Sequence, residues 1–170
     1  MDDDPYGFCY HIEKDAVEVF DKPGLAAFVM QVRARVDDAA KAKPNADGSD
    51  KDSPQRIHRR WGEALRTLYL AQKNLAAYVA LVEETGLTAQ DCSAVATLLV
   101  AGRRPEEALA WVERGIDIHK KAGTGSMAGR HLSRLKLGLL SKLGRGNEAL
   151  EAAWADYRKH PGKYAYEDLM

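Results

Sequence analysis

The sequence is poor in the features that mark extracellular and membrane proteins. Cys9 and Cys92 are the only cysteines among 170 residues, and so widely spaced a pair indicates no disulfide framework. No apolar run approaches the roughly 18 residues that a membrane-spanning helix needs. The first residues are acidic and polar, unlike a secretory signal. We therefore expect a reduced, cytoplasmic protein that has no membrane span.

The chain also lacks net charge, since Lys and Arg balance Asp and Glu. No global field therefore draws it toward nucleic acid or membranes. The charges are nevertheless uneven, because residues 1–52 are net acidic and residues 101–163 are net basic. Two interpretations stay open: the two regions neutralise each other in the fold, or the basic half binds an acidic partner.

Signatures of catalysis and metal binding are missing as well. The sequence has no CxxC, HExxH or GxSxG motif, and no strand or GK[ST] accompanies the glycines of "AGTGS" at 122–126. Cys9 and His11 are two residues apart, and the other histidines are scattered singly. Cys92 is expected to pack as a small buried side chain rather than to act as a nucleophile. We predict no metal, no cofactor and no enzymatic activity.

Sustained alternation of apolar and polar residues is absent, which argues against a sheet. Helical spacing is frequent instead, as in the stripe from Leu25 to Val36. The sequence "KPG" at 22–24 predicts a break, with the helix starting near Leu25. Residues 42–54 hold no large apolar side chain and predict a flexible loop. We thus divide the chain into an N-terminal helical cap at 1–41, the loop at 42–54, and a helical repeat region at 55–170.

Local signals place several helix boundaries in the repeat region. Thr88 is expected to cap a helix together with Asp91, and Pro105 suits the first turn of the next helix. Asn147 is predicted to cap the last full helix. All three tryptophans lie on apolar helical stripes, so we interpret them as packing between helices: Trp61, Trp111 and Trp154.

What is abundant is internal similarity. The segment "LLVAGRRPEEALAWVERGIDIHK" begins at Leu98, and "LLSKLGRGNEALEAAWADYRKHP" begins at Leu139. A weaker copy, "YLAQKNLAAYVALVEE", begins at Tyr69 and matches the residues thirty positions later. Recurring helix pairs with short turns predict an α-solenoid, because one pair cannot bury its own apolar face.

These segments resemble the tetratricopeptide (TPR) repeat, in the turn glycine Gly144, the small Ala149 and the proline Pro161. The earlier copy keeps Ala108 and Gly115, and the likeness covers roughly residues 65–162. It implies an all-α fold of antiparallel helix pairs stacked as a degenerate TPR-like solenoid that binds proteins. The chain is also similar to uncharacterised bacterial proteins, some of which carry a preceding SWIM-type zinc finger whose cysteine and histidine ligand set is absent here.

The expected function is therefore binding. We predict a non-enzymatic interaction module of a bacterial cytosolic protein, whose partner is another protein or a neighbouring domain. The candidate contacts are four basic residues: Arg59, Arg60, Arg130 and Arg134. The alternative is a nucleic-acid-associated accessory domain that uses the basic C-terminal half.

Overall fold

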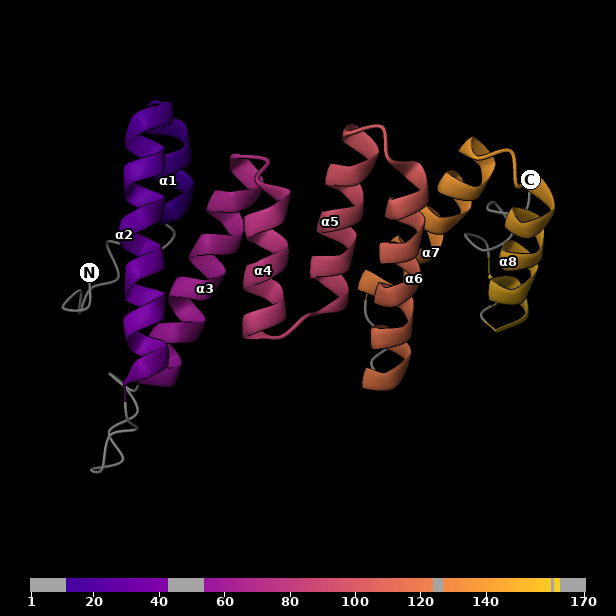
Figure 1. Ribbon diagram of the computed structural model, residues 1–170. Coiled ribbons are helices and arrows are strands. Elements are labelled where there is room, and N and C mark those ends of the chain that lie inside the picture. The colour runs from indigo at the N-terminus through magenta and orange to yellow at the C-terminus, as the bar shows by residue number, and fades with distance from the viewer. Residues whose placement is uncertain (1–11, 43–53, 124–126, 160, 163–170) are drawn as a thin grey trace. The chain divides into compact units, whose positions relative to one another are not determined.

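The computed structural model describes residues 12–42, 54–123, 127–159 and 161–162, which form eight helices and no strand (Figure 1). The all-α prediction is confirmed. Most of the predicted loop at 42–54, the last three residues of "AGTGS" and residues 163–170 lie outside the described residues. The helices are α1 (Ile12–Val19), α2 (Lys22–Lys41), α3 (Pro54–Ala71), α4 (Leu75–Thr85), α5 (Ala89–Ala101), α6 (Pro105–Ala122), α7 (Met127–Lys142) and α8 (Gly146–Lys159).

The chain divides into two compact units, residues 1–86 and residues 87–170. Unit 1 contains α1 to α4, and unit 2 contains α5 to α8. The division follows Gly86, which lies inside the predicted helical repeat region at 55–170.

In unit 1, α3 is the central helix and packs against α1, α2 and α4. The α2 stripe contributes Val29, Val32 and Val36 to a core that also contains Leu65 and Leu68. The predicted break at residues 22–24 is wrong, because these residues form the first turn of α2. The Asp21 carboxylate caps that turn by accepting a 2.8 Å hydrogen bond from the Gly24 N–H.

Polar contacts fix α2 to the α3–α4 pair. The Arg33 guanidinium pairs with both Asp37 on its own helix and Glu84 on α4, each at 2.7 Å. The Arg35 guanidinium lies 5.5 Å from the ring centre of Trp61, whose side chain is only 4% exposed. The packing role predicted for Trp61 is therefore confirmed.

In unit 2, successive helices pack on one another, and α5 also contacts α7. The predicted capping box starts α5: the Thr88 hydroxyl accepts from the Asp91 N–H, and the Asp91 carboxylate accepts from the Thr88 N–H. Gly115 lies where α6 approaches both neighbours. A Cβ there would meet the Cβ of Cys92 at 2.8 Å and a methyl group of Leu132 at 3.1 Å. The missing side chain thus permits close helix packing.

Three helix–helix turns share one backbone geometry. They join α3 to α4, α5 to α6, and α7 to α8, and each has a residue of positive φ in the same place: Lys73 (54°), Arg103 (59°) and Gly144 (73°). The N–H of the following residue, Asn74, Arg104 or Arg145, returns to the carbonyl five residues earlier at 2.9 Å. This pattern is the Schellman motif. The sequence alignment that revealed the repeat places these three turns in register.

Candidate interaction surface

The four predicted contact residues are exposed but lie in different units. Arg59 and Arg60 are on α3 in unit 1, whereas Arg130 and Arg134 are on α7 in unit 2. Arg59 lies 3.9 Å from Glu63 in an exposed ion pair. Arg130 and Arg134 both interact with other groups of the protein. Unit 1 thus contains one basic pair, Arg59 and Arg60, and unit 2 contains the other, Arg130 and Arg134.

The remaining candidate chemistry concerns metal ions and the cysteine thiols. The described part of the chain holds no cluster of three or more His, Cys, Asp or Glu side chains suited to a metal ion. Cys9, His11 and His160 lie outside the described residues. Cys92 is fully buried, as predicted, and burial raises the pKa of its thiol to about 11. Its thiol is therefore protonated and shielded from solvent at neutral pH.

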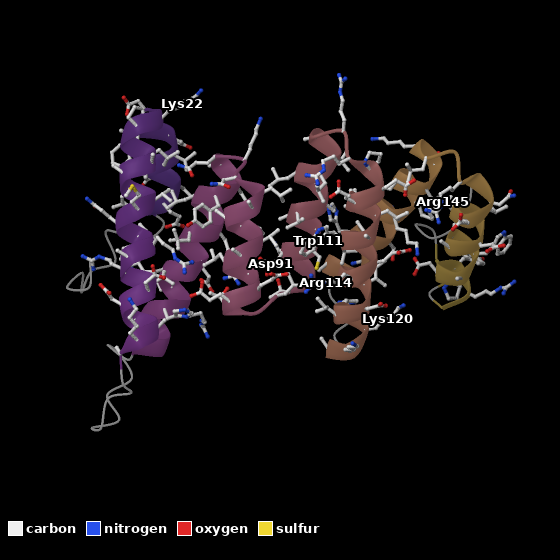
Figure 2. The ribbon with its side chains drawn as sticks, in the orientation of Figure 1. Lys22, Asp91, Trp111, Arg114, Lys120 and Arg145 are labelled. Carbon is white, nitrogen blue, oxygen red and sulfur yellow. The ribbon has the colours of Figure 1, made fainter. Side chains whose placement is uncertain are left out.

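A candidate surface that does not include the predicted arginines lies on α8, the helix that follows the third turn. Ala153 is buried against the neighbouring helix, whereas Leu150 is 50% exposed and Trp154 is 45% exposed. The packing role predicted for Trp154 is therefore wrong for the described residues. Trp111 is intermediate, since it is half-buried on α6 with the Arg114 guanidinium 5.0 Å from its ring centre (Figure 2).

Trp154 contributes to an open hollow of about 340 Å³ on the exposed side of α8. The residues that line this hollow are Glu151, Trp154, Ala155 and Arg158. Tyr157 supports the indole from one side, with the two rings edge-to-face at a centroid distance of 6.0 Å. We call these four lining residues, together with Leu150, the α8 surface. It combines a large aromatic group, an aliphatic group and one charge of each sign.

The equivalent positions of α6, one repeat earlier, show that the α8 surface is unusual within the chain. Leu109 aligns with Leu150 but is only 3% exposed. Glu113 aligns with Trp154, and its carboxylate accepts a 2.8 Å hydrogen bond from the Lys136 ammonium of α7. On α6 the leucine is therefore buried, and the second position holds an exposed glutamate that pairs with α7. On α8 both equivalent positions hold large apolar side chains that are half-exposed.

The turn before α8 fixes the direction of this helix. Arg145 at the N-terminal end of α8 donates two 2.7 Å hydrogen bonds to the Glu148 carboxylate, and these bonds hold the pKa of Glu148 below its usual value (Figure 2). Arg104 and Glu107 form the same bidentate pair before α6. Asn147 is inside α8, so its predicted role as the cap is wrong. The helix begins one residue earlier, after Arg145.

Comparison with known proteins places the chain in a family. A family model described as a family of unknown function (DUF6880) matches residues 1–161. The chain belongs to this family. No match was found among curated proteins or among solved structures.

The match to DUF6880 spans both units and includes all of α8. The α8 surface therefore lies within the family region rather than in an appendage to it. Within the described residues, no helix is both long and apolar enough to cross a membrane. The sequence held one signal for the α8 surface, which is that a tryptophan occupies the place of a charged residue in the preceding copy.

Proposed function

We propose that this DUF6880 protein is a non-enzymatic interaction module that binds another protein or a neighbouring domain in a bacterial cytosol. The observation that carries the proposal is the α8 surface, where Trp154 and Leu150 are half-exposed beside one acidic and one basic residue. Aromatic anchors beside charged groups are typical of protein contact sites. The proposed architecture is a degenerate TPR-like stack, which the three matching turns and the contact of α5 with α7 support.

Binding through this surface needs no rearrangement of the core. The Trp154 ring supplies apolar area, and Glu151 and Arg158 supply charges that orient a partner. The basic pairs Arg59–Arg60 and Arg130–Arg134 remain proposed secondary contacts for acidic groups of a partner.

The proposal is tested by capture from bacterial cytosol with immobilised protein. We expect Trp154→Ala to lower partner recovery at least about tenfold, because a central aromatic contact commonly contributes more than 1.4 kcal/mol. The double variant Arg130→Glu, Arg134→Glu reports separately on the predicted basic contacts. Circular dichroism should be unchanged in both variants, since all three side chains are exposed.

The exposed Lys121 at the end of α6 provides a matched control, Lys121→Glu, which should retain capture. Equal recovery by wild type and Trp154→Ala would remove the α8 surface from the binding site. If the double arginine variant also bound equally, the interaction proposal would lose both of its surfaces.

A further inference from the structure

We propose that the α8 surface binds a second copy of this chain, with two α8 helices packed antiparallel about a two-fold axis. This inference rests on the proposed function and names the partner of the same surface. It is carried by the order of the four residues that line the hollow, because that order is self-complementary.

The lining residues occupy one face of the helix. Residues 151, 154, 155 and 158 have the spacing i, i+3, i+4 and i+7, which repeats on the same side of an α-helix. This spacing is unchanged when it is read in the reverse direction. An antiparallel copy therefore presents the same four positions in the opposite order.

The charges of the lining residues match when two such helices face each other in opposite directions. Across the axis, Glu151 faces the second copy's Arg158, and Arg158 faces the second copy's Glu151. The contact forms two Glu–Arg pairs, in which the guanidinium can donate two hydrogen bonds to a carboxylate. A parallel arrangement would instead set Glu against Glu and Arg against Arg, so charge selects the antiparallel one.

The residue types also fit in size. Trp154 faces the second copy's Ala155, and Ala155 faces the second copy's Trp154, so a large side chain meets a small one on both sides of the axis. Large-against-small packing lets two helices approach to the usual interaxial distance of about 8–10 Å. Leu150 is one turn from Trp154 and extends the apolar strip. A two-fold contact of this kind is isologous, as in most homodimers.

The equivalent face of α6 lacks this self-complementarity. Its residues at the four aligned positions are Ala110, Glu113, Arg114 and Asp117, with acidic side chains at the second and fourth places. Glu113 is held by Lys136 of α7 instead. The self-complementary order therefore occurs on α8, where the large apolar side chains are half-exposed, and is absent from α6, whose four aligned residues are exposed but include no large apolar side chain.

The test measures the mass of the full chain by sedimentation equilibrium at loading concentrations from about 2 to 300 µM, because one helix face is a small interface and should give a dissociation constant in the micromolar range. We expect a monomer–dimer equilibrium. Trp154→Ala should weaken it at least about tenfold.

Exchanging the charges at residues 151 and 158 gives a more specific test of the antiparallel contact. Glu151→Arg alone and Arg158→Glu alone each put like charges opposite one another and should weaken the dimer about tenfold. The double variant Glu151→Arg, Arg158→Glu restores both opposite-charge pairs and should return the dissociation constant to within about threefold of wild type. Lys121→Glu is the control and should dimerise as wild type does.

A wild-type chain that is monomeric throughout this concentration range overturns the inference. It does so equally if the α8 surface is covered by another protein or by a further segment of the same chain. A double variant no better than the single ones overturns the antiparallel arrangement. Failure here is distinguishable from failure of the proposed function. A monomer that still captures a partner through Trp154 keeps the function and loses the dimer.

Discussion

At the scale of the residue, Gly115 shows how one missing side chain permits close helix packing in unit 2. Its missing side chain lets α6 approach α5 and α7, with the Cβ of Cys92 and a methyl group of Leu132 next to it. Gly138 on α7 provides the contrast. It is exposed, and nothing lies within 4 Å of where its Cβ would be. Two helical glycines of the same unit therefore have opposite roles.

We expect Gly115→Ala to destabilise the protein by about 1–3 kcal/mol, because the added methyl group overpacks a dense contact. Gly138→Ala should instead stabilise it by about 0.5–1 kcal/mol, since alanine loses less backbone entropy in a helix. Urea unfolding followed by circular dichroism measures both changes in the free energy of unfolding. Loss of stability in the Gly138 variant, or no loss in the Gly115 variant, would contradict this assignment.

At the scale of the element, the repeated unit is a helix pair joined by a Schellman turn. The turn needs one residue of positive φ, which is Lys73, Arg103 or Gly144 in the three pairs. Glycine adopts this conformation without steric cost, whereas other residues are strained there. The charged pairs Arg104–Glu107 and Arg145–Glu148 then bridge the first turn of the second helix in two of these pairs.

Because a side chain is strained at positive φ, adding one and removing one at this position of the turn should change the free energy of unfolding in opposite directions. Gly144→Ala should lower the free energy of unfolding by about 1 kcal/mol, and Arg103→Gly should raise it by about 0.5–1 kcal/mol. Thermal and urea denaturation provide the measurement. Gly146→Ala, in the exposed first turn of α8, is the control and should change stability less than Gly144→Ala. Shifts of the same sign at 103 and 144 would mean that the turns are not equivalent.

At the scale of the whole molecule, the charge balance bears on the choice between partners. The chain has a formal net charge of zero. Several of its basic residues already pair with carboxylates, including Arg33, Arg104, Lys136 and Arg145. Fewer cations are thus available to neutralise phosphates than the composition of residues 101–163 alone indicates.

We therefore expect no measurable binding of single- or double-stranded nucleic acid at about 150 mM salt, and weak binding at most at about 20 mM salt. Fluorescence anisotropy with labelled oligonucleotides is the measurement. A dissociation constant in the micromolar range or lower would favour the nucleic-acid alternative if it also depended steeply on salt. The slope of log association constant against log salt concentration would then be about −3 or steeper.

Helix boundaries were predicted correctly at some positions and wrongly at others, depending on which sequence signal indicated them. The capping box of Thr88 and Asp91 and the helix start at Pro105 follow from residues that are neighbours in sequence, and both are observed. The break expected at residues 22–24 was wrong because the Asp21 carboxylate caps the first turn of α2, and Pro23 and Gly24 belong to that turn. The cap expected at Asn147 was wrong because the preceding turn already ends at Arg145.

The candidate site depended on contacts that no local pattern encodes. Trp61 and Trp154 both lie on apolar stripes, yet the first is buried under Arg35 and the second is half-exposed. A stripe shows that a face is apolar and does not show whether another helix covers it. For the same reason the sequence placed Arg130 and Arg134 on a helix but did not show that they interact with other groups of the protein.

By itself the sequence determined the all-α class, the capping box of Thr88 and Asp91, the helix start at Pro105 and the register of the repeated turns, because each depends on hydrogen bonds and side-chain periodicity within a few residues. Only the tertiary structure decided that the chain divides after Gly86 and that Leu150 and Trp154 are half-exposed while Leu109 is buried. Exposure is a property of the neighbours that a side chain meets in space, and those neighbours are distant in sequence.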